Sequence, residues 1–192
     1  MPLVEQAKND IRSLANEIAG LATSRLSPAD FYDAFLPRVR TAMGAAAVAV
    51  WRLRDDGQLN LDAHQDLPAE LHDGRTPNPS HAAILTAVLA EGQPVVAPPR
   101  TVSSAPDRPA NPLSSALILV PIRIDERFEY LLEVVLTSTG GPTSQRGYLR
   151  FAAQMSDVLA DYIRRWRLRE TAEQRRRSEL AEQCLLEVAT AQ

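Results

Sequence analysis

Residues 115–136, SALILVPIRIDERFEYLLEVVL, constrain the fold more than any other part of the chain. The first half of this segment is almost continuously apolar, and the second half is rich in β-favouring Phe, Tyr and Val. Only three charged residues, Asp125, Glu126 and Arg127, separate the two halves. The segment therefore predicts two neighbouring central strands in a sheet that is covered on both faces.

Composition sets broad limits on the class of protein. The chain has 192 residues and is 45% hydrophobic, which is enough for one globular domain with helices that extend beyond it. A formal net charge of -3 and an isoelectric point near 5.7 provide no overall attraction to nucleic acid or to an anionic membrane. Cys184 is the only cysteine, so no disulfide can form within the chain. The N-terminus lacks a signal-peptide core, and no run of about 18 apolar residues is present, so we expect a cytoplasmic protein.

Apolar residues near the N-terminus are spaced by alternating steps of three and four. They are Val4, Ala7, Ile11, Leu14, Ile18 and Leu21. This spacing is the a/d pattern of a coiled-coil seam. Because a lone helix of this length is marginally stable, it needs a partner helix, either from a second subunit or from the C-terminal end of the same chain.

Capping and turn residues predict a second helix followed by a hairpin. Ser27 is suited to begin the helix, with proline at the first helical position, and Gly44 is suited to end it. Residues 45–53 and 58–64 have the composition of two strands, and residues 55–57 predict the tight turn between them.

The central part of the chain predicts a short helix, a short strand and a long loop. The helix begins at Asn78, where a proline follows, and ends at Gly92. Residues 94–97 then form a brief strand. Residues 98–112 are dense in proline and have no periodicity, which is typical of a functional or mobile loop.

A long helix is predicted from Tyr148 onward. One face carries apolar residues, namely Leu149, Ala152, Met155, Leu159 and Ile163. Residues 164–179 are almost wholly polar, and apolar residues return from Leu180. We therefore expect an N-terminal dimerisation helix (1–26), a core domain (27–165) and a C-terminal signalling helix (166–192) that leads into a downstream domain of the same polypeptide.

The order of these elements resembles that of a GAF domain. Residues 36–53 are similar to the family's helix and first strand, and residues 91–99 to its helix end and short strand. Residues 115–124 are similar to its hydrophobic strand that ends in proline, and residues 151–165 to its exit helix. The resemblance covers about residues 28–165 and is mainly a hydrophobic pattern.

This resemblance implies an α+β fold of the GAF-like (profilin-like) type. A central antiparallel sheet would have helices packed on one face, with long coiled-coil-type helices at the N- and C-termini. It also implies a non-catalytic sensory or regulatory module, normally a homodimer, that passes a signal to a neighbouring domain. The alternative is a degenerate GAF-like domain that only assembles and spaces its neighbours and binds no ligand.

Three departures from the family pattern limit what the module can bind. Residues 127–130 lack the glycine with which the last strand often begins. The core has no cysteine, which bilin-binding and free-methionine-sulfoxide-reducing relatives need. The only lysine is Lys8, so the constellation of the cyclic-nucleotide-binding relatives is missing.

The resemblance and the predicted loops place a small-molecule cavity between the sheet and residues 67–80 and 98–114. Candidate lining residues are Trp51, His81, Arg100, Asn111, Ser114, Ser115 and Leu117. The alternative is that protein side chains fill this space. Candidate dimer-interface residues are Val4, Ile11, Leu14, Ile18, Leu21, Ile163 and Trp166.

Other chemistry is weakly indicated. His64, His72 and His81 are spaced by eight and nine residues, which suits neither a helical nor a compact metal site. Ser80 precedes His81 without a nucleophile elbow or an orienting carboxylate. The arginines around Trp166 are followed at once by glutamates, as on the outer face of a coiled coil. We therefore expect no enzyme, metal, cofactor, nucleic-acid or membrane function.

Overall fold

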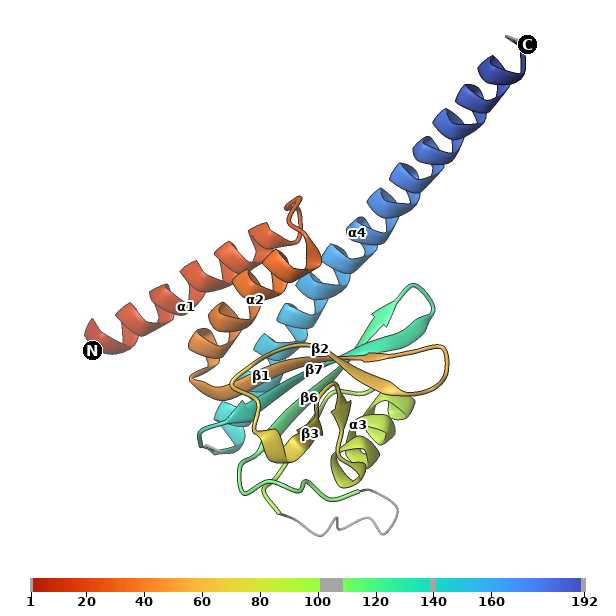
Figure 1. The fold of residues 1–192 in the computed structure, drawn as a ribbon. Helices are drawn as coiled ribbons and strands as arrows, with labels where there is room; N and C mark the ends of the chain where they lie inside the picture. The colour runs from red at the N-terminus through yellow and green to blue at the C-terminus, as the bar shows by residue number, and fades with distance from the viewer. Residues whose placement is uncertain (1, 101–108, 139–140, 191–192) are drawn as a thin grey trace.

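The computed structural model describes residues 2–100, 109–138 and 141–190 (Figure 1). Four α-helices and seven strands are found in these ranges, together with one short 3-10 helix. In chain order they are α1 (Pro2–Leu21), α2 (Pro28–Met43), β1 (Ala45–Leu53), β2 (Leu59–Gln65), η1 (Ala69–Leu71), β3 (His72–Asp73), β4 (Thr76–Pro77), α3 (Pro79–Glu91), β5 (Val95–Ala97), β6 (Leu117–Ile124), β7 (Arg127–Leu136) and α4 (Pro142–Thr190).

The main sheet has five strands in the order β2-β1-β7-β6-β5. Every neighbouring pair is antiparallel. Strands β6 and β7 are internal and almost fully buried along their apolar runs, which confirms the prediction from residues 115–136. The antiparallel α+β fold class is also confirmed.

Helices cover both faces of this sheet (Figure 1). As expected, the long helices are on one face, where α2 and α4 pack on the strands and α1 packs on both helices. The expectation of helices on one face only is corrected by α3, which packs on the opposite face against β6 and β7. Two apolar clusters result, one on each side of the sheet. The second cluster forms because α3 buries Ile84, Leu85, Val88 and Leu89.

The predicted N-terminal seam packs partly within its own chain. Ile18 is fully buried in the cluster between the long helices and the sheet, and Ile163 of α4 is buried in the same cluster. Both were candidates for a dimer interface, but their own chain already covers them, which corrects that assignment. Ile11 is 42% exposed, Leu14 and Leu21 are half-buried, and Trp166 packs at the cluster's edge. The Val4 side chain lies outside the described residues.

Helix α4 begins at Pro142, six residues before the expected start at Tyr148. It continues without interruption past residue 165, so the expected division there falls inside one helix (Figure 1). None of the described helices is long and apolar enough to cross a membrane.

An aromatic contact joins α4 to the start of α2. The ring of Tyr162 stacks on that of Phe31, with centroids 3.7 Å apart and planes at 8°. The Tyr162 hydroxyl also donates a hydrogen bond of 2.9 Å to the carbonyl oxygen of Leu26, in the connection between α1 and α2. Both terminal helices are therefore anchored near one point.

Two helices end at glycines in the left-handed conformation. Gly44 (φ 56°) ends α2 and Gly92 (φ 64°) ends α3, as their positions in the sequence predict. A Cβ atom at Gly92 would lie 2.5 Å from Cε2 of Phe128, the second residue of β7. The start of β7, which has no glycine, is thus approached closely by the glycine that ends α3.

Two β-bulges each have an acidic residue as the extra residue. Between β1 and β2, Val50 pairs with Ala63 and Trp51 with Leu61, so Asp62 is the extra residue. Between β6 and β7, Ile122 pairs with Tyr130 and Arg123 with Phe128, so Glu129 is the extra residue. A bulge reverses the facing of the residues that follow it. The simple alternation expected for β2 therefore fails, and Leu61 and Ala63 belong to opposite apolar clusters.

Candidate functional site

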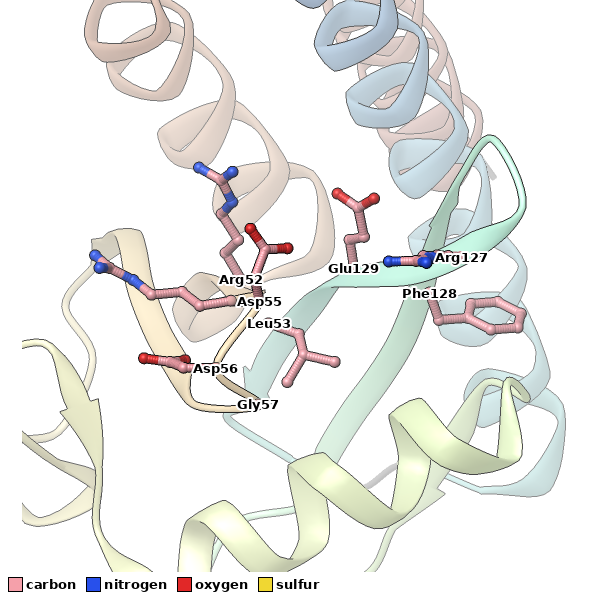
Figure 2. Close-up of a pocket in the computed structure, with 9 residues that line it drawn as sticks. Arg52, Leu53, Asp55, Asp56, Gly57, Arg127, Phe128 and Glu129 are labelled. Atoms are coloured by element: carbon pink, nitrogen blue, oxygen red, sulfur yellow. The ribbon is translucent and has the colours of Figure 1, made fainter.

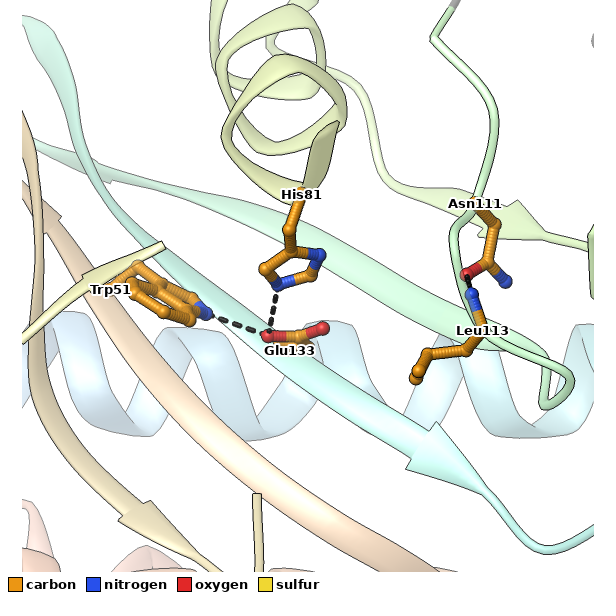
Figure 3. Close-up of polar contacts among 5 residues, drawn as sticks. All are labelled: Trp51, His81, Asn111, Leu113 and Glu133. Carbon is orange, nitrogen blue, oxygen red and sulfur yellow. Dashed lines mark hydrogen bonds and ion pairs between the residues drawn. The ribbon is translucent and has the colours of Figure 1, made fainter. Parts of the chain in front are cut away.

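A polar group of three fully buried residues lies between the sheet and α3 (Figure 3). Trp51 Nε1 donates a hydrogen bond of 2.6 Å to Oε2 of Glu133, and His81 Nε2 lies 3.2 Å from the same oxygen. The rings of Trp51 and His81 meet edge to face, with centroids 5.6 Å apart. One carboxylate oxygen therefore holds both side chains.

Three different elements position this group. Trp51 comes from β1, and Glu133 comes from the middle of β7, where Ala49 and Leu119 are its neighbours across the strands. His81 lies in the first turn of α3, which begins at Pro79. The apolar face of α3 packs on the sheet and thereby presses the imidazole onto the Glu133 carboxylate.

Two atoms of this group have no hydrogen-bond partner, namely Glu133 Oε1 and His81 Nδ1. Burial of an unpaired polar atom costs about 1–3 kcal/mol, and a buried charge is tolerated only when it is paired. Such orphan atoms in a native core are uncommon, and an ordered water, an ion or another bound group can satisfy them. The pair can offer one acceptor and one further imidazole nitrogen to a molecule that reaches it.

The other predicted pocket residues are divided between the core and the surface. Leu117 is fully buried in the same apolar cluster as Trp51. Ser114 and Arg100 are exposed, and Ser115 is half-buried. Trp51, His81 and Leu117 have no solvent-accessible surface. Residues 101–108 of the predicted cavity wall lie outside the described residues.

Asn111 has a structural role at the end of the long loop. Its amide nitrogen donates to the carbonyl oxygens of Ala97, Pro98 and Ser115, at 3.2, 3.1 and 2.8 Å. Its side-chain oxygen accepts from the backbone N–H of Leu113 at 2.9 Å (Figure 3). Because these bonds occupy the amide, Asn111 braces the loop against β5 and β6 and stands apart from the Trp51–His81–Glu133 group.

Glu133 is the residue that sequence reasoning missed. Within LLEVVL, residues 131–136, it is the only charged residue in an otherwise apolar run. A carboxylate that alternation places inside a covered sheet needs a buried partner. That signal was available, but the identity of its partners was not, since they lie 82 and 52 residues away in the sequence.

An open cleft of about 810 Å³ separates the tips of the two hairpins (Figure 2). The β1–β2 side contributes Arg52, Arg54, Asp55 and Asp56, and the β6–β7 side contributes Arg127 and Glu129. Acidic and basic groups are balanced in number, so the cleft has no net charge preference. Phe128 points away from it, toward α3 (Figure 2).

Metal binding finds no support in the described ranges, where no three His, Cys, Asp or Glu residues are grouped to hold an ion. His64 and His72 do lie near each other, with ring centroids 5.4 Å apart. However, Nδ1 of each already interacts with local backbone, at Leu67 and Gly74 respectively. His64 therefore interacts with the segment after β2, and His72 with the turn between β3 and β4.

The fold is that of several solved GAF domains. The structure superimposes on the A. aeolicus nlh2 GAF domain with a TM-score of 0.63 at 16% identity, covering 85% of this chain and 99% of that one. The GAF domain of a putative sensor histidine kinase from Pseudomonas syringae pv. tomato superimposes with a TM-score of 0.59 at 16% identity, covering 89% of this chain and 96% of that one. The free methionine-R-sulfoxide reductase of Neisseria meningitidis superimposes with a TM-score of 0.58 at 18% identity, covering 79% of this chain and 89% of that one.

No protein-family model matches the sequence, and no curated protein is significantly similar to it. The structural matches nevertheless agree with one another in fold and cover most of the chain. The class defined by the five-stranded antiparallel sheet and its helices is therefore the GAF fold. The resemblance seen in the sequence is confirmed at this level.

Proposed function

We propose that this chain is a non-catalytic sensory or regulatory module whose ligand contacts His81 and Glu133. The observation that carries the proposal is a fully buried polar pair with one unpartnered atom on each residue. The neighbours with the same fold include the GAF domain of a putative sensor histidine kinase and a methyl-accepting chemotaxis protein, which supports a signalling role.

The orphan atoms restrict the chemistry of the ligand. Glu133 Oε1 can accept a hydrogen bond, so the ligand should carry an N–H or O–H donor. The surrounding cluster is apolar, since it contains Leu117, Leu119 and Leu85. A small, largely apolar molecule with one donor group fits this environment best. Because His81 has no accessible surface, binding requires α3 to move away from the sheet.

Transmission would follow β7 to the exit helix. Glu133 faces α3, whereas Glu129 on the same strand forms an ion pair with Arg167 of α4. Beyond this pair α4 exposes Leu168 and Leu180, at 71% and 61%. We propose that these residues and the outer face of α1 mediate a homodimer, and that α4 relays the shift to a neighbouring domain.

A second candidate function is a structural spacer without a ligand. The complete burial of Trp51, His81 and Leu117 favours it, because a filled core needs no occupant. In that case the Glu133 network would only specify how α3 docks on the sheet.

Thermal unfolding with a panel of small metabolites separates the two. A ligand at a hundred times its Kd should stabilise the fold by about 2.7 kcal/mol. The shift should disappear in Glu133→Gln and persist in Glu126→Gln, whose side chain is exposed in the β6–β7 turn. Identical melting curves with every metabolite would support the spacer and refute the sensor.

A further inference from the structure

A second cavity, of about 160 Å³, lies on the opposite face of the sheet from His81. It is located where α4 passes the ends of β1, β2 and β7, close to the start of α2. A cavity of about 150 Å³ can hold benzene, so this one suits a molecule of about six to eight non-hydrogen atoms. The Trp51–His81–Glu133 group does not line it.

Aromatic side chains form much of its wall. Three of the chain's four tyrosines, Tyr32, Tyr130 and Tyr162, line the cavity together with Trp166. The guanidinium of Arg52 lies 5.6 Å from the centre of the Tyr130 ring, and that of Arg167 lies 5.9 Å from it. The Tyr130 ring therefore already interacts with cations.

The charged groups on the wall are only partly paired. Arg167 is neutralised by Glu129. Within the described residues, neither Arg52 nor Asp62 nor Glu170 makes an ion pair, although all three line the cavity. All three side chains are solvent-exposed, and Arg52 offsets part of the rise that burial causes in the pKa of Asp62. The cavity thus presents one guanidinium and two carboxylates that form no salt bridge. A molecule that carries both a negative and a positive group complements them together.

The two β-bulges provide an independent observation. One places Asp62 on the cavity wall, and the other brings Glu129 to Arg167. Bulges are frequent next to functional sites, where they re-aim a side chain. Here both re-aimed side chains are acidic: Asp62 lines the cavity itself, and Glu129 pairs with Arg167, which lines it.

We propose that this cavity binds a small zwitterion, of the size of a short amino acid or glycine betaine. Its carboxylate pairs with the Arg52 guanidinium, and its ammonium group lies against Asp62 and the tyrosine faces. Since Trp166 and Arg167 of α4 form part of the wall, the bound molecule touches the exit helix directly. This site is separate from the one under α3, and neither depends on the other.

The test uses the fluorescence of Trp166 in the full chain. Trp51→Phe leaves Trp166 as the only tryptophan, since the chain has two. Glycine, alanine, proline and glycine betaine are titrated to about 10 mM, with acetate and tetramethylammonium as probes of single charge. At least one zwitterion should give a saturable change at constant ionic strength, and the single-charge probes should not.

Matched variants locate the binding. Arg52→Gln and Asp62→Asn should each weaken it at least about tenfold, while Arg54→Gln and Asp55→Asn, which lie outside the cavity, should leave it unchanged. Glu133→Gln should also leave it unchanged, which distinguishes this proposal from the site under α3. Circular dichroism verifies that each variant is folded. No response to any zwitterion, or an equal response to acetate, would overturn the proposal.

Discussion

Glu129 and Glu133 lie four residues apart on β7 yet serve opposite faces of the sheet. Glu133 binds His81 of α3, and Glu129 binds Arg167 of α4. In a regular strand residues i and i+4 point to the same face. The bulge at Glu129 reverses the facing between them, so β7 connects the two sides of the domain through two carboxylates.

Removal of the Glu133 carboxylate should destabilise the domain strongly. Glu133→Ala leaves the indole N–H of Trp51 and the ring of His81 buried without their acceptor, and we expect a loss of about 3–5 kcal/mol in unfolding free energy. Glu133→Gln keeps an acceptor and should lose about 1–3 kcal/mol. Urea unfolding measures both, with Glu126→Ala as a surface control. A loss for Glu133→Ala no greater than for that control would show that the network contributes nothing.

The two helix-ending glycines should respond differently to alanine. At Gly44 a Cβ meets no atom within 4 Å, so Gly44→Ala should cost about 1 kcal/mol, from its left-handed backbone alone. At Gly92 the Cβ atom would in addition clash with Phe128, so Gly92→Ala should lower the unfolding free energy by at least about 2 kcal/mol. When Phe128→Leu is also present, the loss of unfolding free energy caused by Gly92→Ala should come closer to the loss caused by Gly44→Ala. Equal costs at the two positions, measured by thermal unfolding, would contradict the close packing of α3 on β7.

The ion pair between the sheet and α4 should be measurable by a double-mutant cycle. Glu129 and Arg167 are each about a third exposed or less, and we expect a coupling energy of about 1 kcal/mol between Glu129→Gln and Arg167→Met. The pair Glu173–Arg177, which is largely exposed and has N and O 4.0 Å apart, is the control and should give about 0.3 kcal/mol. If the two couplings are equal, the contact does not hold α4 to the sheet.

The raised pKa of Asp62 determines the sign with which this residue makes the folding stability depend on pH. Desolvation by burial raises the pKa of the Asp62 carboxyl, and the nearby Arg52 and Arg54 only partly offset this. A raised folded-state pKa means that the ionised form is the less favourable one, so the penalty appears as pH rises above the ordinary carboxyl pKa of about 3.9. Asp62→Asn removes this penalty.

We therefore expect the stability of Asp62→Asn relative to the parent chain to increase from pH 3 to pH 7. The change should be small, because Asp62 remains open to solvent. Unfolding free energies of both proteins across this range provide the measurement. A relative stability that falls with rising pH would reverse the assignment.

Dimerisation through α1 has a direct test. Ile11 is exposed and Leu14 is half-buried, so Ile11→Asp with Leu14→Asp should leave the fold intact and place charges on the outer face of α1. Sedimentation at micromolar concentration should then shift toward the monomer. Ile18→Asp is unsuitable for this purpose, because it would unfold the core. An unchanged sedimentation profile would remove α1 from the proposed interface.

Much of the fold could be predicted because local signals and long-range packing agree. Gly44 and Gly92 end their helices where predicted, and the apolar run of residues 117–122 forms a central strand. The two bulges could not be predicted, since Asp62 and Glu129 look like ordinary members of alternating strands. The role of Ile18 also escaped prediction, because a seam pattern shows that a face is buried without identifying what covers it.

The candidate site was predicted in part. Trp51 and His81 were both named, and the structure brings them together, but Glu133, which binds them, was not. Asn111 was taken for a ligand contact because of its position, whereas its hydrogen bonds show that it braces a loop. Sequence position could not show which of these side chains contact one another, because their partners lie far apart in the chain.

The contact of Tyr162 with Phe31 and with the Leu26 carbonyl has a mechanical consequence. It lies where the exit helix crosses the beginning of α2, just after the turn from α1. A rotation of α4 would therefore reach the start of α2 and the connection from α1 directly, as well as the strands that α4 contacts. The entry and exit segments of the domain are thus coupled to each other without an intervening strand.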